Sequence, residues 1–241
     1  MIKKIHRLWL GPAKMRDRYK EYGRRWAELN PGWEVHDWSE ADLPPLINQD
    51  IYDELGNGAV APIPLPPHVA IATQRADIAG YELVWMFGGV YVNCDMEPLR
   101  PLDGNIPTDT AWACYEDENL LNNGALGAPE PHHPFWKAVI DELPKRFRRM
   151  PGEPFHKVTG PYLLTDVYRS RDWGGLFTAL PKHLFNYASY MQIPIGGTAA
   201  PFRDAAYAAG AIACHHWGHR VDDIRAPQED DGPGSRRHVY R

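Results

Sequence analysis

Short apolar runs alternate with amphipathic stretches along the first part of the chain. Ile5–Leu10 is a short apolar run, and Trp33–Trp38 alternates large apolar with polar side chains, so each predicts a strand. The charged segment 14–29 between them predicts a helix that a following Asn-Pro-Gly sequence ends. Ser39, with Asp42 three residues later, predicts the start of a second helix. This succession of strands and helices is typical of a parallel α/β sheet.

The strongest helical pattern begins at Val69, with apolar residues three or four positions apart. The pair Gly88-Gly89 ends it, because glycine tolerates the left-handed backbone that closes a helix. The β-branched run Val90–Val92 then predicts a strand, which leads directly into the polar sequence Asn-Cys-Asp at 93–95.

The pattern is weaker beyond residue 100. We expect there a strand, two helices and a final buried segment, at Ala111–Tyr115, Pro134–Phe147, Gly160–Tyr168 and Ala211–Trp217. Residues 222–241 are charged and contain almost nothing to bury. The sequence therefore predicts one domain over residues 1–221, followed by a disordered tail.

Charge and cysteine usage narrow the class of protein. A net charge of -5 gives no electrostatic reason to expect a nucleic acid as partner. Cys94, Cys114 and Cys214 have no paired spacing, which argues against a disulfide framework. His6 and Arg7 break the first apolar run, which is too short for a signal peptide, and no later stretch approaches a membrane span. We expect a cytoplasmic protein.

The residues that follow Val90–Val92 carry the candidate chemistry. Side chains two apart in an extended strand point the same way, so Asn93 and Asp95 are expected to share a face while Cys94 points into the core. Asp77 is expected on the flank of the preceding helix, near the same sheet edge. Open α/β sheets bind ligands at this edge. A carboxylate beside a carboxamide there predicts a site for Mn²⁺ or Mg²⁺ holding a diphosphate.

A set of residues in fixed spacing resembles the glycosyltransferase family whose sugar-binding region contains a DxD motif. That family includes bacterial and yeast mannosyl- and galactosyltransferases and is related to clostridial glucosylating toxins. The resemblance implies an α/β fold of the GT-A type found in nucleotide-diphospho-sugar transferases, with a mainly parallel central sheet flanked by helices. The residues that match the family pattern are Asp77, Tyr81, Gly88, Gly89, Val90, Tyr91 and Asp95.

Further segments of the chain resemble the same family in the expected order. Ile5–Gly11 is similar to its first strand, in which Trp9 is implied to lie beside the nucleotide base. Asn123-Gly124 and Thr159-Gly160-Pro161 resemble two later family segments, and the sequence at 215–217 (HHW) is similar to a C-terminal segment that closes over the donor.

The resemblance also implies the roles of single residues. Asp77 and Asp95 are implied to be catalytic, and Asp95, Asn93 and His215 to bind Mn²⁺ or Mg²⁺. The partner is implied to be a UDP- or GDP-sugar, from which a hexose moves with retention at the anomeric carbon and without a protein nucleophile. The residues implied to bind this donor are Trp9, Asp77, Tyr81, Tyr91, Asn93, Asp95, Asn123, Gly124 and Trp217.

Two departures from the family pattern keep other functions open. Asn93 stands where the family has the first acid of its DxD motif, and it brings no charge. Gly80 stands where the family has an arginine that contacts the sugar or the diphosphate. The alternatives are a lapsed relic that binds a nucleotide sugar without turnover, a donor hydrolase, and a glycosyltransferase that modifies nucleic acid. Taken singly, Asp77, Asn93 and Asp95 also fit ordinary helix, strand-end and turn residues.

Overall fold

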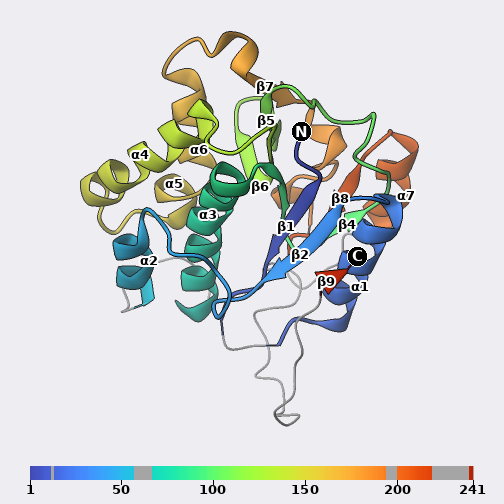
Figure 1. Ribbon diagram of the computed structural model, residues 1–241, viewed down its shortest axis with the longest axis horizontal. Helices are drawn as coiled ribbons and strands as arrows, with labels where there is room; N and C mark the ends of the chain where they lie inside the picture. Colours follow the sequence, from blue (N-terminus) through green and yellow to red (C-terminus); the bar gives the residue numbers. More distant parts are fainter. Residues whose placement is uncertain (12–13, 57–66, 194–199, 219–238, 241) are drawn as a thin grey trace.

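A seven-stranded sheet forms the centre of the molecule (Figure 1). The computed structural model describes residues 1–11, 14–56, 67–193, 200–218 and 239–240. Within them the strand order is β7-β5-β6-β3-β1-β2-β9. Only β6 and β9 run against the common direction, so the expected mainly parallel sheet is confirmed. The strands are β1 (Lys4–Leu8), β2 (Glu34–Trp38), β3 (Gly89–Val92), β5 (Ala111–Tyr115), β6 (Leu121–Ala128), β7 (Phe177–Leu180) and β9 (Val239–Tyr240).

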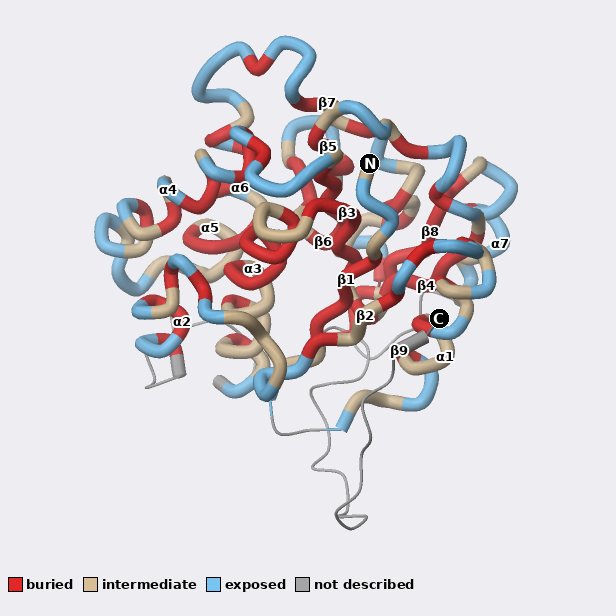
Figure 2. Tube along the Cα trace, in the orientation of Figure 1, coloured by how far each residue is buried: buried red, intermediate tan, exposed pale blue. Residues whose placement is uncertain are grey.

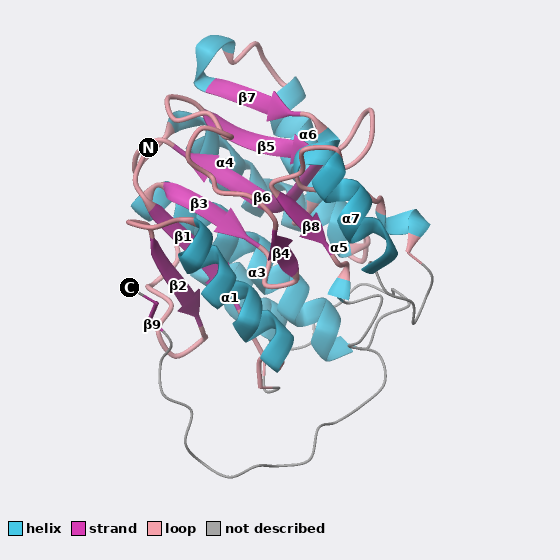
Figure 3. Cartoon of the chain, turned by 90° about the vertical axis from the view of Figure 1, so that its right-hand side faces the viewer, coloured by secondary structure: helices cyan, strands magenta, loops and turns pink. Residues whose placement is uncertain are grey.

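Helices cover both faces of this sheet (Figures 1 and 3). One side carries α2 (Gln49–Gly56), α3 (Pro67–Phe87), α4 (Pro134–Arg149), α5 (Phe155–Val158) and α6 (Pro161–Arg169). The other side carries α1 (Asp17–Leu29) and α7 (Ala200–Ala208), together with an antiparallel ribbon of β4 (Met96–Pro98) and β8 (Ala213–His215). Among the described residues, no helix combines the length and the apolar character that crossing a bilayer requires.

The strands β1, β3, β5 and β6 are mostly buried (Figure 2), and their side chains contribute to two hydrophobic cores. Tyr91 of β3 packs in the same core as Ile78 of α3. Val90 and Val92 point the other way, into a core shared with Trp26 of α1. A strand covered on both faces reads as a continuous apolar run, which is the pattern that predicts β3 from the sequence.

Gly88 and Gly89 connect α3 to β3 through left-handed backbone. Their φ angles are +66° and +82°, a region that side chains rarely adopt. A Cβ atom at Gly89 would also collide with the main-chain carbonyl of Lys4 in β1. The predicted end of the helix is confirmed, and the glycines let β3 lie directly beside β1.

Ser39 does not begin a helix, in contrast to the expectation. Residues 39–42 form a turn, in which Asp42 Oδ1 accepts hydrogen bonds of 2.6 Å from both the backbone N–H and the hydroxyl of Ser39. The reason lies in the prolines at 44 and 45, because a residue that precedes proline disfavours helical backbone. The next helix is α2, which starts at Gln49.

The expected disordered tail, 222–241, lies mostly outside the described residues. Val239–Tyr240, which are described, pair antiparallel with β2. The expected buried segment near the C-terminal end contains β8, whose three residues are all buried.

Arg7 and Asp37 form a buried ion pair between neighbouring strands. They are direct partners in the parallel pairing of β1 with β2, and Arg7 Nη1 lies 3.0 Å from Asp37 Oδ1. The Arg7 side chain is fully buried. Its other terminal nitrogen donates a hydrogen bond to the main-chain oxygen of Tyr19 in α1. The arginine therefore ties α1 to the carboxyl ends of β1 and β2.

Replacement of Asp37 by Asn should lower the free energy of unfolding by about 3–5 kcal/mol, because it leaves the buried Arg7 guanidinium without its counter-charge. Urea unfolding measures this loss. The matched control is Asp141→Asn, which removes the exposed Lys137–Asp141 pair and should cost less than about 1 kcal/mol. A loss no larger than that of the control would contradict the role given to the buried pair.

Candidate functional site

The chain leaves the sheet after β3 in a tight turn. The backbone N–H of Met96 donates to the carbonyl of Asn93 at 3.0 Å, and residues 94 and 95 form the turn. The expected extended strand therefore does not continue to Asp95, because β4 turns away to pair with β8. Cys94 is buried, as expected, and its Sγ donates to the Leu8 carbonyl of β1 at 3.0 Å.

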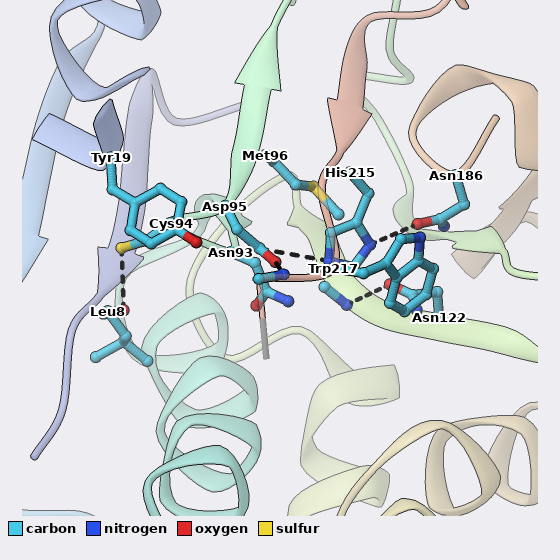
Figure 4. Close-up of polar contacts among 12 residues, drawn as sticks. Leu8, Tyr19, Asn93, Cys94, Asp95, Met96, Asn122, Asn186, His215 and Trp217 are labelled. Carbon is cyan, nitrogen blue, oxygen red and sulfur yellow. Dashed lines mark hydrogen bonds and ion pairs between the residues drawn. The ribbon is translucent and has the colours of Figure 1, made fainter. Parts of the chain in front are cut away.

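The β4–β8 ribbon brings the C-terminal part of the chain to this turn (Figure 4). Met96 is paired with His215, so the imidazole lies beside the carboxylate that precedes Met96. His215 Nε2 is 3.4 Å from Asp95 Oδ1. The other carboxylate oxygen, Asp95 Oδ2, accepts a 2.6 Å hydrogen bond from the backbone N–H of Gly218. Asp95 and His215, which the resemblance places in one site, are thus in contact.

The hydrogen bonds of Asn186 fix the tautomer of His215. Asn186 Nδ2 donates to the Tyr115 carbonyl at 3.2 Å, so Asn186 Oδ1 is the oxygen that faces His215 Nδ1 at 3.0 Å. An amide oxygen only accepts, so Nδ1 carries the proton and Nε2 of the neutral ring has a lone pair. This Nε2 atom is buried and has no hydrogen-bond partner among the described residues. Its lone pair faces a carboxylate oxygen, and a cation satisfies two such acceptors at once.

These residues fit a divalent cation. Neighbouring ligands of one ion, at about 2.0–2.1 Å from it, lie about 3 Å apart, close to the observed separation of His215 Nε2 and Asp95 Oδ1. The Asn186 contact is the type of outer hydrogen bond that orients a metal-binding imidazole. Within the described ranges no three His, Cys, Asp or Glu side chains form one such group, so further ligands would come from other groups, such as the bound substrate or water.

Asn93 is oriented by its neighbours at the end of β3. Its Oδ1 accepts a 2.8 Å hydrogen bond from the Tyr91 hydroxyl. Its backbone N–H donates to the Gly124 carbonyl of β6 at 2.8 Å. A Cβ atom at Gly124 would stand 2.8 Å from Asn93 Nδ2, so glycine is needed there for the amide to fit. The resemblance places Tyr91, Asn93 and Gly124 in one site, and they are neighbours.

Asp77 is enclosed by neutral hydrogen-bond donors. Asn123 Nδ2 and the Thr159 hydroxyl donate to its two carboxylate oxygens, each at 2.7 Å. Burial raises the pKa of Asp77 to about 7, although these two hydrogen bonds lower it. The Tyr81 hydroxyl donates to the Thr159 carbonyl at 3.1 Å and supports the same loop. Three segments that are separate in the sequence therefore meet at one carboxyl group.

Trp9 and Trp217 border the site in different ways. Trp9 follows β1, and its ring centre lies 5.6 Å from that of Tyr19. The Tyr19 hydroxyl and Asp95 both lie against Gly218, where a Cβ atom would collide with the hydroxyl. Trp217 is buried and stacks on His215 with ring centres 3.9 Å apart. Its φ of 52° is rare for a residue other than glycine and marks a tightly constrained position.

Glu97 is a site neighbour that sequence reasoning misses. It is buried, and it accepts hydrogen bonds from Arg25 of α1, Arg203 of α7 and His216, at 2.7–3.0 Å. Burial raises the pKa of Glu97, but the hydrogen bonds from His216 and Arg203 outweigh it and hold the pKa at about 2. No spacing in the sequence connects Glu97 with these partners, or Asn186 with His215, because each pairing arises from the fold.

Comparison with known proteins agrees with the resemblance drawn from the sequence. Residues 16–112 match a family model described as the glycosyltransferase sugar-binding region containing a DXD motif. The resemblance is therefore confirmed over the segment that contains Asp77, Tyr81, Tyr91, Asn93 and Asp95.

Several glycosyltransferases are similar in sequence. Inositol phosphoceramide mannosyltransferase 2 of Schizosaccharomyces pombe is 25% identical over 149 residues, which cover 58% of this chain and 43% of the relative. An uncharacterized glycosyltransferase of Acanthamoeba polyphaga mimivirus is 21% identical over 143 residues, covering 58% of this chain and 54% of the relative. The chain thus spans about half the length of the curated relatives it matches.

Solved structures are similar in fold. The PaToxG glycosyltransferase superposes with a TM-score of 0.56 and 13% identity, covering 70% of this chain and 68% of the toxin domain. The ligand-free glycosyltransferase domain of the YGT toxin gives a TM-score of 0.50 and 11% identity, covering 73% of this chain and 79% of that domain. The GT-A type fold is thereby confirmed.

Replacement of Asp77 by Asn should change how stability depends on pH. The folded-state pKa, about 7, lies above the ordinary value of 3.8, so the folded protein holds a proton that the unfolded chain releases. Wild-type stability is fully present below pH 4 and falls as the pH rises towards and through 7. The amide of the variant does not titrate. Between pH 4 and pH 8 the free energy of unfolding of the wild type should therefore fall by roughly 2–4 kcal/mol more than that of the variant.

Urea unfolding of both proteins across this pH range measures the effect. The amide fits the same partners, since its oxygen accepts from Asn123 and its NH₂ donates to the Thr159 hydroxyl. A stability difference that stays constant with pH would show that the Asp77 carboxyl titrates normally.

Proposed function

We propose that this chain, whose residues 16–112 carry the sugar-binding region of that family, is a retaining, metal-assisted glycosyltransferase. It takes a hexose from a UDP- or GDP-linked donor and transfers it to an acceptor. The observation that carries the proposal is the contact of Asp95 with His215 at the carboxyl end of β3, where two acceptor atoms face one another across 3.4 Å. Ligands of open α/β sheets bind at this end of the strands.

Two neighbouring groups of side chains are assigned to different parts of the donor. Asp95 and His215 would hold the divalent cation, which when bound would neutralise charge on the departing diphosphate. Asp77 and Asn123, which are hydrogen-bonded to one another, take the hydroxyl groups of the sugar. Trp9, at the end of β1, takes the nucleotide base. These assignments follow the resemblance and are supported by the neighbouring positions of the residues.

Transfer with retention requires no nucleophile from the protein. Departure of the diphosphate leaves an oxocarbenium-like sugar, and the acceptor hydroxyl attacks from the face the diphosphate left. A diphosphate oxygen takes the acceptor's proton. This differs from retaining glycosidases, which use two carboxyl groups about 5 Å apart as nucleophile and acid/base.

The identity of the donor and the acceptor is open to direct test. One relative is named as an inositol phosphoceramide mannosyltransferase, which makes a GDP-mannose donor and inositol-bearing acceptors natural first choices.

The second candidate function is a relic that binds the donor without turnover. Asn93 and Gly80 favour it, because each replaces a charged residue of the family pattern with an uncharged one.

A thermal-shift panel should identify the donor class. UDP-, GDP- and dTDP-sugars are each tested with Mn²⁺, Mg²⁺ or EDTA. A ligand that binds the native state raises the melting temperature by mass action. One nucleotide class should therefore give a shift that is larger with Mn²⁺ or Mg²⁺ than in EDTA. Product analysis with and without acceptors then separates transfer from hydrolysis, and binding without any product would support the relic.

The variant Asp95→Asn should abolish the metal-dependent shift and lower transfer at least about a hundredfold, because it removes the carboxylate charge that holds the cation. The fold should persist, since the amide oxygen still accepts from the Gly218 N–H. Asp141→Asn, on the exposed surface of α4, serves as the control and should leave both readouts unchanged. Unchanged transfer in Asp95→Asn would contradict the proposed function.

A further inference from the structure

The ring of Tyr91 lies against Gly80 of α3. A Cβ atom at position 80 would stand 3.2 Å from Tyr91 Cε1 and 3.3 Å from Cζ, tighter than ordinary contact. Tyr91 is 3% exposed, so its ring has little room to move away. Glycine at position 80 therefore leaves the room that the Tyr91 ring occupies.

The Tyr91 hydroxyl determines which end of the Asn93 amide is free. It lies 2.8 Å from Asn93 Oδ1, and because an amide oxygen only accepts, the tyrosine donates. Tyr91 and Asn93 are two residues apart at the end of β3, so both side chains leave the sheet on the α3 side. Asn93 thereby presents its NH₂ group, with two N–H donors, rather than its oxygen.

The NH₂ group of Asn93 has space and no acceptor within the described part of the chain. Gly124 provides the space, because a Cβ atom there would stand 2.8 Å from Asn93 Nδ2. The nearby Asn122 oxygen is already engaged, since it accepts from the Gly124 backbone N–H at 2.7 Å. Asn93 is half-buried, so its Nδ2 can be reached from the solvent side.

We propose that Asn93 is a hydrogen-bond donor to an oxygen atom of the bound nucleoside diphosphate rather than a ligand of the cation. Tyr91 is the positioning residue that holds the amide in this orientation, and Gly80 is the residue that admits Tyr91. The inference rests on the proposed function and refines it. Among the described residues, Asp95 and His215 then remain as the proposed ligands of the cation. The two departures from the family pattern, Gly80 and Asn93, are connected, because Gly80 admits the tyrosine that orients Asn93.

The test is a set of nucleotide dissociation constants measured by calorimetry on the full chain. UDP and GDP are the probes, each in EDTA and in Mn²⁺. The variant Asn93→Asp replaces an N–H donor with a charged acceptor, so it should weaken binding in EDTA at least about tenfold. Tyr91→Phe releases the amide and should weaken binding about three- to tenfold. Gly80→Ala displaces the ring and should have an effect of the same size.

A double-mutant cycle separates positioning from general structural damage. In an Asn93→Ala background, Tyr91→Phe should change the dissociation constant less than about twofold, because the group on which Tyr91 acts is gone. The control is Tyr52→Phe on α2, which removes a buried hydroxyl with no hydrogen-bond partner among the described residues. It should leave nucleotide binding unchanged.

Two results would overturn the inference while leaving the proposed function intact. One is tighter binding of Mn²⁺ and nucleotide by Asn93→Asp, which would make position 93 a cation ligand. The other is an equal effect of Tyr91→Phe with and without Asn93. Failure of the wild-type protein to bind either nucleotide in any condition would instead overturn the proposed function and this inference together.

Discussion

The register of the short β4–β8 ribbon is the constraint on which the site depends. Met96 faces His215 in this pairing, and the imidazole reaches Asp95 only because of it. A slip of one residue would reverse the faces of β8 and turn His215 away from the carboxylate. The Glu97 network opposes such a slip, since Glu97 binds residues of α1 and α7 as well as His216. A structural ion pair network thus fixes the position of the imidazole that is proposed to hold the cation.

The two aspartates of the site differ because their partners differ. Asp77 meets the uncharged donors Asn123 and Thr159, which stabilise a half-buried carboxyl without compensating its charge, and desolvation raises its pKa to about 7. Asp95 accepts a hydrogen bond from a backbone N–H and faces the lone pair of His215 Nε2, an arrangement that a bound cation would complete. The first environment is suited to hydroxyl groups and the second to a cation. The proposed assignment of the sugar to Asp77 and of the diphosphate to Asp95 follows this difference.

The sequence predicts the fold better than it predicts the details of the site. The sequence predicts β3 because burial on both faces restricts a strand to apolar residues. It predicts the end of the preceding helix because left-handed backbone favours glycine. The family resemblance implies that Asp77 and Asn123 both bind the donor, but it does not predict that Asn123 and Thr159 contact Asp77. The turn at residues 93–96, the role of Asn186 and the Glu97 network are not predicted, because they arise from pairings between segments far apart in the chain.

The late position of β8 in the sequence has a consequence for synthesis. Asp95 and His215 are more than a hundred residues apart, and the ribbon that joins them closes only after Ala213–His215 has left the ribosome. The sheet from β1 to β6 can assemble earlier, because its strands all precede residue 129. A nascent or prematurely terminated chain that stops before β8 therefore has much of the sheet but lacks half of the Asp95–His215 contact, so the proposed cation site is complete only in a product that extends past residue 215.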